Sequence, residues 1–296
     1  MSGSYTAAAD VSQALEALAA GARPVAGGTD LVVGARQGKA PLPDDLVAIH
    51  AVGELRGVST TADGGLRLGA LITHADIASS AEVLDRYTAL ADASAIVGSH
   101  ATRHVGTLGG NLMNASPAME TGGPLMCLGA SAVLASQSGE RRLAVDDLVA
   151  GPGRTTAQPG ELLTAVELPP AGPGSGSCYV RLEYRRQMEI AVVGATCAVQ
   201  LGASGVGSAR IAITALAPTI RRVPEAEAAL AGSDGGEQAV GAAAALAAAA
   251  AQPITDVRAP AEYRRAMATV IARRAITIAV ARARGQHVPV PASANR

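Results

Sequence analysis

The stretch Thr107-Leu108-Gly109-Gly110-Asn111 decides the fold, together with a second glycine turn that reads Ala26-Gly27-Gly28-Thr29-Asp30. Glycine lets a backbone approach a ligand closely and adopt a positive φ, and successive N–H groups in such a turn can bind an anion. A helix that starts at the first turn would add its dipole. The two turns therefore predict two backbone cradles for one phosphate-bearing ligand.

Small polar side chains accompany the glycines: Thr29 and Thr107 offer hydroxyl groups, and Asn111 offers a side-chain amide. The alternative is two tight turns without a ligand, because glycine turns are common and this chain has 34 glycines. Neither turn matches the better-known phosphate loops. Gly-x-Gly-x-x-Gly is missing at the first strand, and so is the Gly-Lys-Ser/Thr of a P-loop.

Composition narrows the class of protein. The 296 residues suffice for one large domain or for two or three small ones, and 49% of them are hydrophobic. The net charge of -1 gives no overall field that would attract nucleic acid or an anionic membrane. Phe and Trp are absent, which disfavours a platform for stacked bases. We therefore expect a globular protein without a nucleic-acid partner.

The remaining reactive residues form no recognisable centre. Cys127, Cys178 and Cys197 stand apart, so we expect buried thiols, no metal site and no iron–sulfur cluster in this chain. The histidines form no triad with a nucleophile, and no catalytic residue is assigned. We find no signal peptide and no apolar stretch of membrane-spanning length, so we expect a cytoplasmic protein without an integral membrane segment.

Patterning divides the chain into three parts. A small α/β unit covers 1–55, a mixed α and β unit covers 56–172, and strands followed by helices cover 177–296, after a linker rich in Pro, Gly and Ser at 169–177. We expect a long helix over about 82–97 and another near the C-terminus. In that last helix, a core stripe is predicted at Met267, Val270, Ile271, Arg274 and Ile278.

Three stretches resemble the FAD-binding medium subunits of molybdenum hydroxylases, the family of carbon monoxide dehydrogenase and xanthine dehydrogenase. The first two contain the glycine turns, at 25–31 and 106–118, and the third is Tyr184-Arg185-Arg186-Gln187-Met188-Glu189-Ile190-Ala191-Val192-Val193-Gly194. The resemblance spans nearly the whole chain. It implies an α+β fold with mixed α/β parts: a two-part FAD-binding domain of the PCMH type over 1–55 and 56–172, then a small antiparallel sheet with a helix bundle over 177–296.

The resemblance also implies a cofactor site. Gly27, Gly28 and Thr29 would hold the FAD pyrophosphate with Gly110 and Asn111, and other positions would flank it or reach the ribityl chain and the flavin ring. Arg181 falls where a basic residue approaches the carbonyl edge of the ring and would stabilise negative charge on the reduced flavin. The full set of expected cofactor-binding residues is Ala26, Gly27, Gly28, Thr29, Asp30, Thr107, Gly109, Gly110, Asn111, Ser116, Glu120, Leu163, Arg181 and Ile190.

Two positions depart from the family pattern. Glu120 stands where Asp is common, and Ile190 stands where an aromatic residue can lie against the flavin ring. Ile190 cannot stack in that way, so the shielding and the potential of the flavin are expected to differ. Simple core packing is the alternative role for Ile190.

By resemblance, the chain is an oxidoreductase subunit. A large partner subunit with molybdopterin would oxidise the substrate, a small one with [2Fe-2S] clusters would relay electrons, and the FAD of this chain would pass them to an acceptor. A heterohexamer, as a dimer of heterotrimers, is expected. A scaffold subunit with a redox-silent flavin and a stand-alone flavin oxidoreductase are the alternatives. The resemblance leaves open the acceptor and the substrate, which is carbon monoxide, a purine, a nicotine-like compound or another N-heterocycle.

Overall fold

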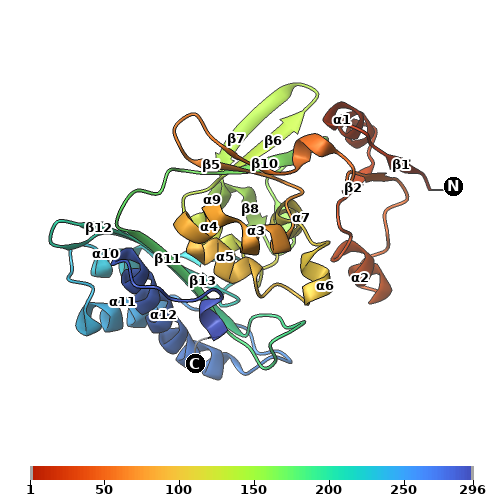
Figure 1. Cartoon of the computed structure of the whole chain (residues 1–296). Coiled ribbons are helices and arrows are strands. Elements are labelled where there is room, and N and C mark those ends of the chain that lie inside the picture. Colours follow the sequence, from red (N-terminus) through yellow and green to blue (C-terminus); the bar gives the residue numbers. More distant parts are fainter. Residues whose placement is uncertain (1–2, 295–296) are drawn as a thin grey trace.

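The computed structural model describes residues 3–294, which form three larger sheets in chain order and one two-stranded sheet (Figure 1). The first sheet has the strand order β1-β3-β2, with β1 at Tyr5–Ala7, β2 at Arg23–Val25 and β3 at Leu46–Ala48. Its strands are parallel, because helix α1 (Val11–Ala19) connects β1 to β2 and α2 (Leu31–Arg36) lies between β2 and β3. Asp10 caps α1 by accepting a hydrogen bond from the Gln13 N–H over 2.8 Å.

The second sheet is antiparallel and has the order β4-β5-β10-β6-β7. The helices between β5 and β6 form the centre of the molecule (Figure 1). The strands are β4 (Val58–Thr60), β5 (Leu66–Gly69), β6 (Ser131–Ser136), β7 (Gly139–Ala144) and β10 (Leu162–Leu168). The helices are α3 (His74–Ser79), α4 (Ala81–Arg86), α5 (Thr88–Ser94), α6 (His100–Arg103), α7 (Leu108–Asn114) and α8 (Gly122–Cys127). Small elements follow at α9 (Val145–Leu148), β8 (Val149–Gly151) and β9 (Arg154–Thr155), and η1 (Gly53–Leu55) precedes β4.

The third sheet is an antiparallel meander of β11 (Ser175–Leu182), β12 (Val193–Gly202), β13 (Gly205–Thr214) and β14 (Arg221–Arg222). One face packs on the C-terminal helices α10 (Pro224–Leu230), α11 (Glu237–Ala249) and α12 (Ala261–Ala283), which are blue in Figure 1. The other face packs on α5 and α8 of the middle region. A short turn, η2 (Ala292–Ala294), ends the described chain. Because both faces are covered, the sheet joins the C-terminal helices firmly to the centre of the molecule.

The structure confirms the expected fold class, which mixes helices with antiparallel sheets and one small parallel sheet. Two expectations about helices were wrong. The helix expected over 82–97 is broken at Tyr87, whose side chain turns into the core and whose hydroxyl donates to the carbonyl oxygen of Pro169 over 2.8 Å. In α12, the buried stripe runs through Arg264, Ala268, Ala272, Ala275 and Ala279, so of the predicted stripe only Ile271 is fully buried. The small alanines let the helix lie close to the sheet, which the larger side chains would prevent.

Candidate functional site

The two glycine turns touch each other. Gly27 lies against the backbone just before the second turn, where an added methyl group would collide with the carbonyl oxygen of Val105. Thr29 Oγ1 lies 3.6 Å from the position that a Cβ on Gly106 would take. Glycine at position 27 therefore permits the closest approach between the two segments.

The first turn offers a row of unused donors. In the described part of the chain, the N–H groups from Gly27 through Leu31 donate to no protein acceptor. Gly28 has a φ of +67°, which turns the chain between β2 and α2. The Asp30 side chain makes no capping bond to α2. This turn therefore offers several successive backbone donors that have no protein acceptor among the described residues, which suits an anion.

The second turn uses its backbone differently from the expected cradle. Thr107 caps α7 by accepting from the Gly110 N–H over 3.1 Å, and the Gly109 N–H donates to the carbonyl oxygen of Ala70 over 2.9 Å. The Leu108 N–H donates to the carbonyl oxygen of Ile72 over 3.0 Å. These N–H groups are therefore occupied. Gly109 serves close packing, because a Cβ there would lie 2.7 Å from the Ala70 oxygen, while Gly110 is exposed.

Side chains supply the polar groups of the second turn. Asn111 accepts a hydrogen bond at Oδ1 from the Thr121 hydroxyl over 2.6 Å, which leaves its Nδ2 as a donor. Ser116 Oγ accepts from the Ala118 N–H over 3.2 Å, so its own hydroxyl proton is available to another partner. The second turn therefore contributes oriented side chains where the first contributes backbone.

A buried charge cluster follows the second turn. Arg181 on β11 donates from Nη1 to Glu120 over 2.6 Å and from Nε to Glu183 over 2.6 Å, and its side chain is 0% exposed. Burial raises the pKa of Glu120, although the Arg181 guanidinium opposes that shift. Burial acts to lower the pKa of Arg181, but the Glu120 carboxylate and the other anionic groups nearby outweigh it and the pKa is raised. Arg181 Nη2 is buried and has no partner in the described chain.

The two remaining predicted positions lie in contrasting surroundings. Leu163 on β10 is 3% exposed and packs among the apolar residues of the middle core. Ile190 is 56% exposed, close to Met188, which has a φ of +52°. The structure therefore places Leu163 inside the core and Ile190 at the surface, beside the buried cluster whose Arg181 also contacts the Glu189 carbonyl oxygen.

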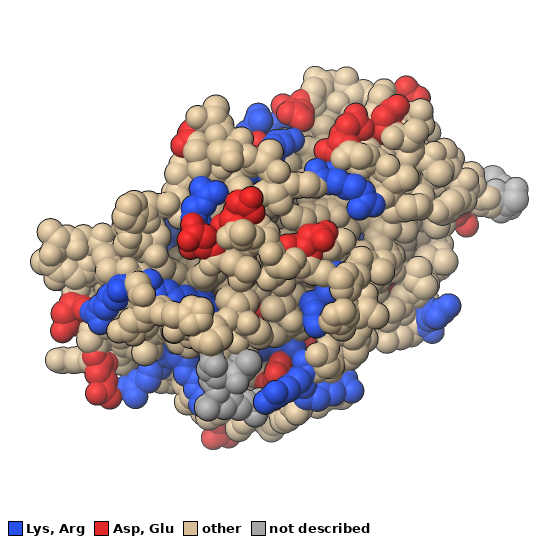
Figure 2. Space-filling view, in the orientation of Figure 1, with Lys and Arg blue, Asp and Glu red and all other residues tan. Residues whose placement is uncertain are grey.

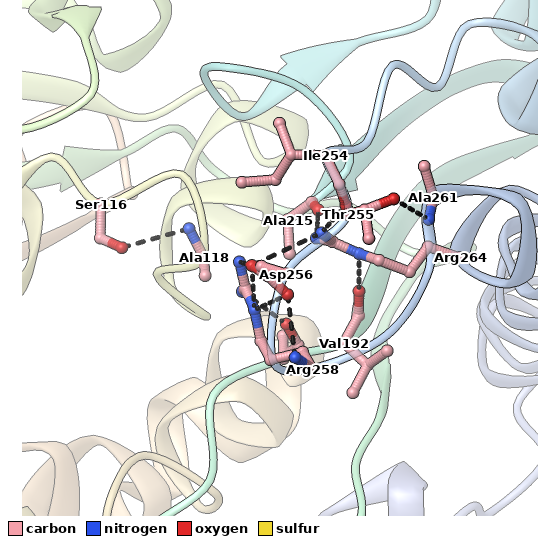
Figure 3. Close-up of polar contacts among 11 residues, drawn as sticks. Ser116, Ala118, Val192, Ala215, Ile254, Thr255, Asp256, Arg258, Ala261 and Arg264 are labelled. Carbon is pink, nitrogen blue, oxygen red and sulfur yellow. Dashed lines mark hydrogen bonds and ion pairs between the residues drawn. The ribbon is translucent and has the colours of Figure 1, made fainter.

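Two arginines that sequence patterns did not single out hold the backbone of residues 190–192, which we call the Ile190 segment (Figure 3). Arg264 donates from Nε to the carbonyl oxygen of Val192 over 3.0 Å and also binds the carbonyl oxygens of Ile254 and Ala215. Arg258 donates to the carbonyl oxygen of Ala191 over 3.1 Å. The only sequence signal for Arg264 is its spacing, which puts it on the same face of α12 as the buried alanines.

His74 is a further residue that sequence patterns did not single out. It begins α3, is 1% exposed, and donates its backbone N–H to the carbonyl oxygen of Gly106 over 3.1 Å. Burial, with a smaller effect from Arg103, lowers the pKa of His74 to about 4. The imidazole is therefore neutral at pH 7, packed directly behind the second glycine turn.

The remaining features of the described residues are their surface charges, their potential metal ligands and the hydropathy of their helices. Lys, Arg, Asp and Glu side chains are interspersed over the face seen in Figure 2. Residues 3–294 contain no group of His, Cys, Asp and Glu side chains arranged to hold a metal ion. Among the same residues, no helix is long and apolar enough to cross a membrane.

Comparisons with known proteins identify the family. Residues 1–171 match the FAD binding domain in molybdopterin dehydrogenase, and residues 179–279 match the CO dehydrogenase flavoprotein C-terminal domain. The chain belongs to the family of molybdopterin dehydrogenase flavoproteins.

Relatives agree with this assignment along almost the whole length. The carbon monoxide dehydrogenase medium chain of Afipia carboxidovorans is 32% identical over 276 residues, which cover 93% of this chain and 95% of the relative. A subunit of the 6-hydroxypseudooxynicotine dehydrogenase complex of Paenarthrobacter nicotinovorans is also 32% identical, over 95% of each chain. The structure of a Cu,Mo-CO dehydrogenase matches with a TM-score of 0.90 and 31% identity, over 95% of this chain and 99% of that one.

The molybdopterin dehydrogenase flavoprotein family implies FAD, and the residues present fit this cofactor. The free N–H groups of Gly27, Gly28 and Thr29 suit the negative charge of a pyrophosphate, and Asn111 Nδ2 adds a donor. Arg181 Nη2, buried and unpaired, suits a polar atom of a ligand. These donors come from both matched regions, because Arg181 of the C-terminal domain pairs with Glu120 of the FAD binding domain.

Proposed function

We propose that this flavoprotein subunit transfers electrons within a molybdenum-containing hydroxylase or dehydrogenase. Its FAD takes electrons from the [2Fe-2S] clusters of a small partner subunit, after a large molybdopterin subunit has oxidised the substrate. The subunits assemble as a dimer of heterotrimers. The contact between the two glycine turns carries the proposal, because it joins the free donors of Gly27–Leu31 to the side chains that follow Thr107.

Each predicted position has a distinct task in this proposal. Gly27, Gly28 and Thr29 bind the pyrophosphate with their backbone N–H groups, and Asn111 donates to it from Nδ2. Ala26 and Asp30 border this turn, while Thr107 and Gly109 hold the second turn in place against it.

The remaining positions act toward the ribityl chain and the ring. Ser116 and Glu120 bind near the ribityl chain, and Arg181 donates from its unpaired Nη2 to the carbonyl edge of the ring. Ile190 shields the ring, and Leu163 supports that region from within the core. Bound FAD would supply the ability to collect two electrons one at a time and pass them to an acceptor, and no catalytic acid or base is assigned in this chain.

A substitution at Gly110 tests cofactor binding directly. A Cβ at this exposed position would meet only Thr107 Oγ1, at 3.0 Å, so the fold of Gly110→Val should survive while the pyrophosphate is blocked. The control is Gly34→Ala in α2, where no heavy atom lies within 4 Å of the new Cβ. We expect a flavin absorption spectrum from wild type and Gly34→Ala and none from Gly110→Val. Equal FAD content in a folded Gly110→Val would refute this assignment.

Electron transfer is tested on the assembled complex. Stopped-flow addition of substrate should bleach the flavin absorption of this subunit, whereas a subunit that serves only as a scaffold would keep its flavin oxidised. Glu120 in place of the common Asp and the exposed, non-aromatic Ile190 are the features that favour the scaffold alternative. Native mass spectrometry tests the partners, because a stand-alone flavin enzyme would purify without two further chains.

A further inference from the structure

Two buried carboxylates share one guanidinium beside the proposed flavin region. Arg181 contacts Glu120 and Glu183 at 2.6 Å each, through different nitrogens. The exposed fractions of the three side chains are 0% for Arg181, 9% for Glu120 and 7% for Glu183. The second carboxylate, Glu183, lies outside every position expected from the sequence to touch the cofactor.

The charges of this cluster do not balance. With both carboxyl groups ionised, one cation faces two anions, and the net charge of the cluster is negative in a place shielded from water. Such a charge is costly to bury and readily binds a proton. Burial raises the pKa of Glu120, and the Glu183 charge adds to that shift.

The surrounding groups do not neutralise the excess charge by direct contact. Glu189 offers its carbonyl oxygen to Arg181, while its carboxylate pairs with Arg185 over 3.3 Å. Arg103 at the end of α6 lies near enough to feel the charge of Arg181, but it donates to the carbonyl oxygen of Val97. The Tyr179 hydroxyl on β11 is buried without a partner and stays protonated, because burial raises its pKa well above the usual value.

We propose that Glu120, which shares the Arg181 guanidinium with Glu183, binds one proton from solvent when the bound FAD is reduced. This inference rests on the proposed function, because it requires flavin near the unpaired Nη2 of Arg181. Reduction by two electrons would add one proton to the flavin ring, and the Glu120 carboxylate takes a second proton from solvent. The negative charge that remains on the reduced ring is thereby compensated at the cluster. Glu183 acts through Arg181 and Glu120, and so is a positioning and charge-setting residue.

Proton uptake measured during reduction tests this inference. The FAD-loaded chain, in weak buffer near pH 7.5 with a pH-indicator dye, is reduced photochemically, and the protons taken up are counted per FAD. We expect Glu183→Gln to take up about one proton fewer than wild type, because without the Glu183 charge the Glu120 carboxylate stays ionised when the FAD is reduced. Glu161→Gln is the control, since the Glu161 side chain is 9% exposed, close to the 7% of Glu183, and is paired with an arginine, Arg141. It should match wild type.

A second measurement needs no cofactor. In the cofactor-free chain, a carboxyl-carbon NMR titration should show a lower pKa for Glu120 in Glu183→Gln than in wild type, because a like charge has been removed. In the proton-uptake experiment on the FAD-loaded chain, Glu183→Asp keeps the carboxylate and should give the same proton count as wild type. Equal proton counts for wild type and Glu183→Gln, or an unchanged Glu120 pKa, would overturn this proposal and leave FAD binding intact. Failure of the wild-type chain to bind FAD would instead overturn the proposed function.

Discussion

Thr121 donates its hydroxyl to Oδ1 of Asn111 over 2.6 Å, and this bond decides which end of the Asn111 amide faces a ligand. Thr121 is fully buried at the start of α8, so the bond is protected from water. The amide oxygen is satisfied, and the Nδ2 group remains free to donate. Thr121 thus orients the Asn111 amide so that its Nδ2 is the group available to a ligand.

Asn111→Asp is expected to weaken FAD binding severely. The substitution keeps the size and the bond from Thr121, but it replaces a donor by an anion that faces the pyrophosphate. We expect at least about a hundredfold loss of affinity, equivalent to the loss of a charge-assisted hydrogen bond with added repulsion. Fluorescence titration of the cofactor-free chain with FAD measures it. Wild-type affinity in a folded Asn111→Asp would contradict the role of Nδ2.

Thr121→Val should have a smaller effect in the same direction. The Asn111 amide loses the partner that holds its orientation, and we expect roughly a tenfold lower FAD affinity. Thr88→Val is the matched control, because Thr88 also donates over 2.6 Å, but to the carbonyl oxygen of Ser177 between α5 and β11. If both valine variants lose affinity equally, the effect comes from general destabilisation.

Gly27→Ala is expected to separate the two turns. The added methyl group meets a backbone oxygen, that of Val105, which cannot rotate away as a side chain would. Val105 is 51% exposed and Gly27 is half-buried, so the sheets should persist while FAD affinity falls by at least about tenfold. Circular dichroism checks the fold, and flavin titration measures binding. Gly34→Ala again serves as control, and unchanged FAD affinity in Gly27→Ala would show that the contact between the turns is dispensable.

Local patterns drew attention to the two glycine turns but did not give their backbone geometry. Gly28 has the positive φ expected of a glycine turn, whereas Gly110 lies in the first turn of α7, capped by Thr107, a helix start that the sequence did not single out. The use of the Gly109 N–H was not predictable in this way, because its acceptor Ala70 belongs to a distant segment. For the same reason, Glu183 was missed. Its role appears only when β11 brings Arg181 beside Glu120.

His74 should make the fold sensitive to mild acid. Its pKa is about 4 in the folded chain, against an ordinary value near 6.5, so between these pH values the unfolded chain binds more protons. Stability is therefore present above pH ~6.5 and is lost as the pH falls toward 4, by about 3 kcal/mol in total. Urea unfolding across this range should show a shallower pH dependence for His74→Gln than for wild type. The exposed His100→Gln is the control and should keep the wild-type slope.

Arg264 should control the order of the Ile190 segment as well as the stability of the fold. Its side chain is 1% exposed and holds three carbonyl oxygens, those of Val192, Ala215 and Ile254, so Arg264→Met leaves them without a donor. We expect a loss of at least about 3 kcal/mol of unfolding free energy, because each buried acceptor left unsatisfied is costly. Arg265→Met, at an exposed neighbouring position of α12, should change stability little.

A second readout separates local order from overall stability. Hydrogen exchange at the Val192 amide, which donates to the carbonyl oxygen of Leu182 over 3.0 Å, reports directly on the segment that follows Ile190. In Arg264→Met this amide should exchange faster than amides of the first sheet, such as Ile49, which donates to Val25 over 3.0 Å. Equal acceleration at both amides would mean that Arg264 supports the whole fold without a specific hold on the Ile190 segment.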